Sequence, residues 1–333
     1  MKSYLRASSL PVVNISQVLI PRLILGHMPF VGESYQGPQK NREYRQTFSD
    51  LENTVALLRR SVENHGLTVT TAMASKNELA ALFLKGVKKA IQQSGVDVAL
   101  IPCFQIPLTI DGQPINDYRR WVTYYNIEKN QTKNLLEKYV TDPILLCRTG
   151  WRDKFPKAIV QSQPYDRTQI QKLKIDWKKL RNALSYMDGF NVILAELGSE
   201  SDFLVMTGRF DLLERLRNRV ADYFSCPIVL GIHHAGSTIP ILETQGQKFA
   251  AYVTPVNKLG ALMLPTKNQA QIAIRKTTTP IMAIKPLAGG RLQPTQAFQY
   301  VYEEMRTPTC MIGVGTKKEM DQDVRVAHQF LSS

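Results

Sequence analysis

The chain has few cysteines, and their spacing excludes several classes of protein. Only four occur in 333 residues, at Cys103, Cys147, Cys226 and Cys310. They form neither a CxxC pair nor the dense framework of a small disulfide-stabilised domain. We therefore expect ordinary buried thiols and a reducing, cytoplasmic environment.

Long apolar runs are also missing. Proline or charge interrupts every stretch before it reaches the roughly 18 apolar residues that a membrane span needs. Residues 1–11 contain Lys2, Arg6 and several serines but no apolar core of a secretory signal. The sequence predicts a soluble protein without a membrane partner.

Acidic residues are in deficit, with 28 Asp and Glu against 42 Lys and Arg and a net charge of +14. A polyanion partner would suit this balance, but the basic residues are dispersed, and no zinc-finger, RNA-recognition or helix-turn-helix signature accompanies them. We predict no nucleic-acid partner. Any local surplus would serve a phosphorylated or carboxylated small-molecule substrate, and a homo-oligomer stays open.

Against these absences stands a repeated pattern of short apolar runs, each followed by loop-prone residues and most then by a helical stretch. The runs span residues 23–26, 67–71, 96–101, 191–197, 227–232, 249–253, 280–284 and 309–314. Alternating buried strands and helices are typical of a (β/α)₈ TIM barrel. We predict one such α/β domain over residues 1–333.

One connection is far longer than a usual βα loop. Residues 104–187 include all three tryptophans of the chain, too aromatic a composition for a disordered linker. We interpret this segment as an ordered insertion or lid over the C-terminal face of the barrel. Residues 143–148 are also strand-like, so either they or 96–101 supply the third barrel strand.

Chemically reactive side chains follow the predicted strands. Glu196, His233 and His234 come at neighbouring strand ends and are candidate acid–base residues. With His27 from the first strand, Glu196 and His233 would make a two-histidine, one-carboxylate site for a divalent metal. Alternatively, Glu196 pairs with a basic residue in a structural network.

Two further strand ends carry cations. Lys285 emerges from an apolar strand directly before Pro286, where a desolvated amine could form a Schiff base or bind a substrate anion. Asn257 and Lys258 end the sixth run and add an amide and a second cation.

Glycine-rich loops follow the seventh and eighth runs, where barrels frequently bind phosphate through backbone amides. The candidate phosphate-binding residues are Gly289, Gly290, Arg291, Gly315, Thr316, Lys317 and Lys318. The alternative is that the glycines only permit tight turns.

Several of these segments, in their order, resemble the aldo-keto reductase superfamily over about two-thirds of the chain. They are residues 21–32, 66–78, 191–196 (NVILAE), 228–233 (IVLGIH), 256–257, 284–292 (IKPLAGGRL) and 312–323 (IGVGTKKEMDQD). The resemblance implies a TIM barrel that binds NADP(H), with the loops after the last two strands holding the cofactor.

The catalytic set of that superfamily is not kept. Thr70 stands where the family has aspartate, Ser75 where it has the tyrosine proton donor, and Glu196 where it has histidine. The family lysine would fall at Pro102 or, in the other register, near Arg148. An alcohol is far less acidic than a phenol, so another group must donate the proton.

Three functional hypotheses follow. The first is a divergent NADP(H)-dependent oxidoreductase for a small polar or phosphorylated molecule, with Glu196 and His233 or His234 as acid–base groups. The second is a metal- or lysine-assisted lyase, isomerase or hydrolase that uses His27, Glu196, His233, His234 and Lys285. The third is a binding or scaffold barrel without catalysis.

Overall fold

Parallel strands of the described chain close into a barrel. The computed structural model describes residues 3–6, 10–74 and 77–331. Its largest sheet has the order β10-β11-β12-β13-β14-β3-β4-β5-β9, and a further pairing of β10 with β5 closes the ring. The barrel strands are β3 (Leu23–Gly26), β4 (Val69–Met73), β5 (Ala99–Phe104), β10 (Ala195–Leu197), β11 (Ile228–Gly231), β12 (Ala251–Pro255), β13 (Ile281–Ile284) and β14 (Thr309–Gly313), and short β9 (Asn191–Val192) extends beside β5. The predicted (β/α)₈ TIM barrel is confirmed.

The third barrel strand is β5, which overlaps the predicted run at residues 96–101. The competing segment, residues 143–148, forms a single 3-10 turn, η2 (Leu145–Cys147). The Asp142 side chain causes this turn, because its Oδ1 accepts the amides of Ile144 at 2.9 Å and Leu145 at 3.2 Å. An apolar run of this length does not distinguish a strand from a turn.

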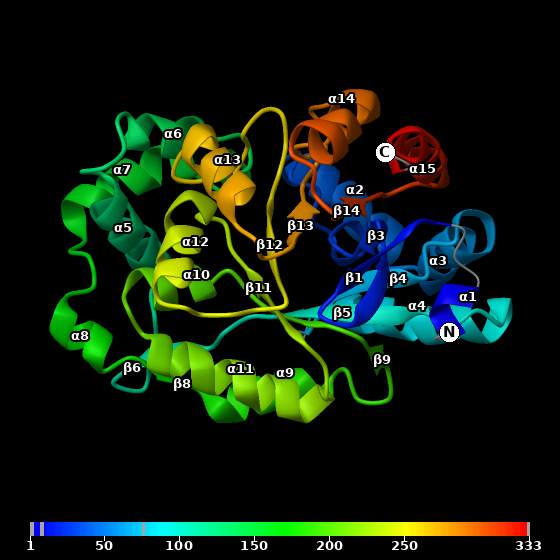
Figure 1. The fold of residues 1–333 in the computed structure, drawn as a ribbon, viewed down its shortest axis with the longest axis horizontal. Helices are drawn as coiled ribbons and strands as arrows, with labels where there is room; N and C mark the ends of the chain where they lie inside the picture. Colours follow the sequence, from blue (N-terminus) through cyan, green and yellow to red (C-terminus); the bar gives the residue numbers. More distant parts are fainter. Residues whose placement is uncertain (1–2, 7–9, 75–76, 332–333) are drawn as a thin grey trace.

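Helices surround the barrel (Figure 1), and side-chain caps mark where several begin. Asp50, Asn77 and Thr266 each accept a backbone amide at a helix N-terminus. The elements outside the long insertion are η1 (Pro29–Val31), α2 (Pro38–Phe48), α3 (Leu51–His65), α4 (Glu78–Ser94), α10 (Ser201–Met206), α11 (Phe210–Phe224), α12 (Ala235–Thr244), α13 (Lys267–Lys276), α14 (Pro294–Gln299), the π-helical turn η3 (Tyr300–Glu304) and α15 (Lys317–Leu331).

The long insertion is ordered and lies to one side of the barrel, far from both chain ends (Figure 1). It contains β6 (Leu108–Ile110), β7 (Gln113–Pro114), α5 (Asp117–Glu128), α6 (Leu135–Thr141), η2, α7 (Trp151–Gln161), α8 (Arg167–Gln171), β8 (Lys174–Ile175) and α9 (Trp177–Ser185). Asp142 accepts the amide of Leu262 at 2.7 Å, and Lys138 donates to the Gly260 carbonyl at 2.7 Å. The insertion is therefore fixed to the loop that follows β12, at the carboxyl ends of the strands.

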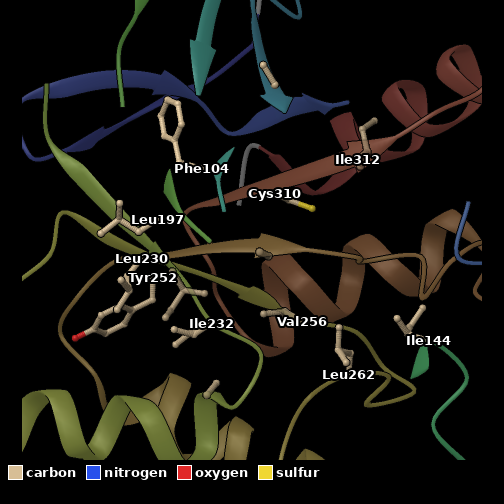
Figure 2. Close-up of a cluster of buried hydrophobic side chains, with 14 of the residues drawn as sticks. Phe104, Ile144, Leu197, Leu230, Ile232, Tyr252, Val256, Leu262, Cys310 and Ile312 are labelled. Carbon is tan, nitrogen blue, oxygen red and sulfur yellow. The ribbon is translucent and has the colours of Figure 1, made fainter. Parts of the chain in front are cut away.

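Two hydrophobic layers hold the barrel together. The outer layer packs strands against helices and insertion, and Figure 2 shows part of it, with Leu197, Leu230 and Tyr252 on neighbouring strands. The inner layer fills the barrel with side chains such as Val69 and Val229. It also includes residues of α1 (Ser3–Arg6) and of the antiparallel hairpin formed by β1 (Val12–Ile15) and β2 (Val18–Pro21). Since strand side chains alternate between these layers, register decides which residues reach the axis.

Among the described residues, no helix combines the length and the apolar character that crossing a bilayer would require.

Candidate active site

A cavity of about 620 Å³ lies at the carboxyl ends of the strands. Alternation along β10 directs Glu196 into it, because Ala195 and Leu197 on either side belong to the outer layer. Cys103, one residue before outward-facing Phe104, reaches the same cavity from the adjoining strand β5. Several of the predicted strand-end residues, among them His27, Glu196 and His233, line this cavity.

Glu196 is a buried carboxyl in the lining of this cavity. Burial raises its pKa to about 7, although a hydrogen bond with Cys103 and the charge of Lys285 both act in the opposite direction. Burial also raises the pKa of the Cys103 thiol well above its usual value, so Cys103 stays protonated. A carboxyl with a pKa near 7 can both donate and accept a proton at neutral pH.

The Glu196 carboxyl fits because the neighbouring strand β11 carries a glycine, Gly231, beside it. A Cβ built on Gly231 would lie 2.5 Å from Glu196 Oε1 and 2.8 Å from the Leu197 carbonyl oxygen. Any larger residue at this position would therefore displace the carboxyl.

Two predicted histidines, His27 and His233, also line the cavity, and both are neutral. Burial and then Lys285 lower the pKa of His27 to about 4. Its Nδ1 lies 2.7 Å from the Thr71 hydroxyl, whereas its Nε2 is buried without a partner among the described residues. Burial, followed by Lys285, lowers the pKa of His233 well below its usual value.

His234 lies outside the cavity lining, and its role as a direct acid–base residue is not supported. Its Nδ1 lies 2.9 Å from Glu128 Oε1 in α5, and its ring packs 4.4 Å from that of Tyr124 between centroids. Burial opposes the charged form, but Glu128 and Asp202 raise the pKa of His234 overall. The two histidines separate because consecutive residues at a strand end point in different directions.

Lys285 is the one lysine or arginine among the described residues that line the cavity. It has a left-handed backbone, with φ of 56°, directly before Pro286. Its Nζ lies 4.4 Å from the centroid of the Tyr35 ring, a cation–π contact. The ammonium thus has a fixed place near Glu196, His27 and His233, each of whose pKa values it lowers.

The predicted metal site is not formed. Within residues 3–6, 10–74 and 77–331, no three His, Cys, Asp or Glu side chains converge to hold a metal ion. His27 and Glu196 come from β3 and β10, which are not neighbours in the barrel, and each is tied to a residue on another strand, Thr71 and Cys103 respectively. Lining one cavity does not bring their ligand atoms within a shared coordination sphere.

In the predicted phosphate loop after β13, two residues line the cavity and the third holds the loop in place. Gly289 and Gly290 line the cavity with positive φ values of 67° and 73°. Arg291 is not among the lining residues, because its guanidinium holds backbone carbonyls in place, donating to Tyr35 at 2.7 Å and Ala288 at 2.9 Å. Arg291 therefore supports this loop from behind.

The residues predicted to bind phosphate after β14 are absent from the cavity lining. Lys317 and Lys318 are exposed, while Gly315 makes room for the Tyr44 ring, with which an added Cβ would clash. Thr316 accepts the Glu319 amide at 3.1 Å as the start of α15. The Glu319 carboxylate in turn accepts the Gly315 amide at 2.7 Å, so the protein's own anion occupies this helix N-terminus.

After β11, too, a carboxylate of the protein occupies the amides at which an anion could bind. Asp202, fully buried in α10, accepts the amides of His233 at 2.7 Å and His234 at 3.3 Å and the hydroxyl of Thr238 at 2.6 Å. The amides at this helix N-terminus, which could otherwise bind an anion, therefore already have a partner.

Asn257 and Lys258 also lie away from the cavity lining. The Asn257 amide is fully buried and holds its own loop, donating to the Ala261 carbonyl at 2.9 Å and accepting the Ala261 amide at 2.8 Å. Lys258 is exposed and pairs with Glu304 at 3.7 Å. Both are structural in this arrangement.

Carboxylates outnumber cations in the lining, which the overall charge of +14 did not indicate. Glu200 is paired with Arg120 of the insertion at 3.1 Å. The acidic lining residues are Glu33, Glu196, Glu200, Glu319 and Asp323. Glu319 and Asp323 are one helical turn apart in α15, a spacing from which their shared face could have been found.

Comparison with known proteins adds evidence on the fold. No family model matches the chain, and no curated protein matches it in sequence. Two solved structures of Pseudomonas aeruginosa proteins, each described as a candidate aldo-keto reductase, match over nearly the whole chain. The first has a TM-score of 0.51 at 12% identity and covers 99% of this chain and 100% of its own. The second has a TM-score of 0.52 at 12% identity and covers 96% and 94%.

The chain has the aldo-keto reductase fold.

On this aldo-keto reductase fold, the four positions at which the resemblance places the catalytic set do not all lie at the cavity. Thr70 is buried outside the cavity lining and donates to the Leu25 carbonyl at 2.9 Å, and Ser75 lies outside the described residues. With β5 as the third strand, the lysine position falls at Pro102, while Arg148 stacks 4.4 Å from the Trp151 ring within the insertion. Among those of these positions that the structure describes, only Glu196 lines the cavity.

Proposed function

We propose that the protein is an oxidoreductase that reduces a carbonyl group of a small polar molecule, with Glu196 as the proton donor. The observation behind this proposal is the buried Glu196 carboxyl with a pKa of about 7, at the cavity formed by the carboxyl ends of an aldo-keto reductase barrel. Active sites of TIM barrels lie at this face.

The chain's own residues divide the work between them. The protonated Glu196 carboxyl donates its proton to the carbonyl oxygen, and the Lys285 ammonium stabilises the negative charge that develops there. His27 and His233 are neutral, so they orient a polar substrate without adding charge. The inner apolar layer beneath these groups limits access of water from the barrel side.

A nicotinamide dinucleotide would supply the hydride when bound. The cavity extends from Glu196 to Gly289 and Gly290, whose lack of a Cβ leaves the backbone accessible. At the same loop, a Cβ on Gly289 would lie 2.7 Å from the Tyr35 carbonyl oxygen. Lys285, Gly289 and Gly290 would hold the cofactor, but the lining offers no cation at α15 for the additional phosphate of NADP(H).

Substitution of Glu196 by Gln tests the proposal. We expect nicotinamide absorbance to be lost when the wild-type protein meets small aldehydes and ketones, and E196Q to lower kcat by roughly 100-fold or more, a usual share for general acid catalysis. Because the protonated carboxyl is required, the wild-type kcat should fall as pH rises through about 7. E137Q, at an exposed glutamate of α6, is the matched control and should keep full activity.

Fluorescence titration with NADH and NADPH separates binding from chemistry. If neither dinucleotide binds, or if E196Q reduces carbonyls at the wild-type rate, the proposed function is wrong.

A proton-transfer enzyme without hydride transfer, an isomerase or lyase, is the second candidate. It is favoured by Asp202 and Glu319, which fill both helix N-termini that phosphate groups would use. Such an enzyme would exchange a substrate α-proton with deuterated water in a Glu196-dependent way, with no dinucleotide present.

A further inference from the structure

The cavity has a second chemically distinct region, which we call the α15 end, formed by Tyr44, Glu319, Gln322 and Asp323. It lies beside β14, four strands around the barrel from β10 and Glu196. A ligand that reaches Glu196 and is long enough to cross the mouth would therefore place its other end here.

Asp323 indicates that this end binds something. Its side chain lines the cavity, and only 6% of the residue is exposed. The Asp323 carboxyl makes no hydrogen bond to the side chain or backbone of another described residue. Burial and then Glu319 raise its pKa to about 7. A buried carboxyl without a partner costs free energy, and a donor supplied by a ligand would remove that cost.

The neighbouring groups offer hydrogen bonds without positive charge. Burial, followed by Glu319, raises the pKa of Tyr44, so its hydroxyl stays neutral. Gln322 adds a side-chain amide on the next residue of α15. Glu319 is directed toward the helix N-terminus by its bond to the Gly315 amide, and it holds negative charge at this end.

A phosphate group is poorly matched to these surroundings. The nearest lysines in sequence, Lys317 and Lys318, are exposed and do not line the cavity. A phosphate would meet two carboxyl groups, and the α15 amide that could have bound it is already occupied. By contrast, a carboxylate accepts hydrogen bonds from a ribose 2′-hydroxyl, which is how dinucleotide sites recognise NAD.

We infer that the α15 end binds an uncharged vicinal diol, with Asp323 accepting from a hydroxyl, and that it excludes a phosphorylated sugar. Resting on the proposed function, this assigns NAD(H) rather than NADP(H) as the dinucleotide. It also opposes a phosphorylated substrate at this end of the cavity.

Calorimetric titration of the whole protein with four probes tests the inference: NAD⁺, NADP⁺, ADP-ribose and its 2′-phosphate. We expect each unphosphorylated probe to bind at least about tenfold more tightly than its phosphorylated counterpart, because hydrogen bonds to a charged group are lost. D323N should weaken NAD⁺ binding and reduce this ratio. D321N changes the same helix at the Asp321 carboxyl paired with Arg60, outside the cavity lining, and should leave the ratio unchanged.

The outcomes separate the two proposals. Equal or tighter binding of NADP⁺, or an unchanged ratio in a folded D323N with its wild-type melting temperature, overturns the diol assignment while the oxidoreductase proposal survives. Failure of all four probes to bind overturns both.

Discussion

Burial shifts the pKa values of Glu196 and His27 in opposite directions, and in both cases it favours the uncharged form. The pKa of Glu196 rises to about 7 and that of His27 falls to about 4, because in each case the charged form loses hydration. Near neutral pH His27 and His233 are uncharged, and Glu196 is poised between its two forms. These shifts cannot be predicted from residue types, because they depend on how deeply the fold buries each group.

Gly231 is the residue on which the placement of Glu196 depends most closely. G231A introduces a methyl group 2.5 Å from Glu196 Oε1 and 2.8 Å from a backbone oxygen that cannot move away. We expect a loss of about 1–3 kcal/mol in the free energy of unfolding, as is usual for overpacking, and at least a tenfold fall in kcat. Urea unfolding and steady-state kinetics would measure the two effects.

G313A provides a milder comparison at another strand end that lines the cavity. Its added carbon would lie 3.1 Å from Pro29 Cδ, a side-chain contact that a small shift relieves. If G231A lowers the free energy of unfolding and kcat no more than G313A does, the close fit between Gly231 and the Glu196 carboxyl contributes to neither stability nor catalysis.

At the scale of helices and strands, the sequence predicts which elements form better than it predicts which groups occupy their ends. Buried parallel strands are almost continuously apolar, so the runs around β11, β13 and β14 were recognisable without coordinates. The loop after β14 was also recognisable as a candidate anion site, but the Glu319 carboxylate occupies it. The amides of His233 and His234 after β11 are likewise occupied, by Asp202 from a different βα unit, a contact that the sequence does not reveal.

Glu128 is the most deeply buried of the polar links between the insertion and the barrel that are described above, together with Asp142. Its buried carboxylate contacts His234 Nδ1 at 2.9 Å and accepts the hydroxyls of Ser237 at 2.6 Å and Tyr139 at 2.8 Å. E128A would remove this partner from all three groups, of which His234 and Tyr139 are fully buried, and we expect it to cost about 3–5 kcal/mol in the free energy of unfolding. Amide hydrogen exchange should quicken in α5 and α12 together.

The exposed variant E137A on α6 serves as its control and should change stability by less than about 0.5 kcal/mol. A wild-type unfolding free energy for E128A, or faster exchange in α5 alone, would mean that the insertion is held by packing rather than by this network.

For the whole molecule, the barrel and its insertion share one hydrophobic cluster, which includes Phe104 and Ile144 beside Leu197 and Val256 (Figure 2). Of residues 104–187, Gln105 is the only described lining residue of the cavity, and the insertion mainly contacts the loops after β10, β11 and β12. Closure of the barrel followed from the count and order of apolar runs. The place of the insertion did not, because its contacts join residues over 100 positions apart, such as Glu128 with His234.

The central claim is that this barrel holds a neutral carboxylic acid at its mouth near pH 7. Carbon-13 NMR of the protein labelled at its glutamate side-chain carboxyls tests this most directly. We predict one carboxyl resonance that titrates near pH 7 in the wild type and is missing from E196Q. If every glutamate titrates below about pH 5, in the range of exposed carboxyls, Glu196 is ionised at neutral pH and cannot be the proton donor.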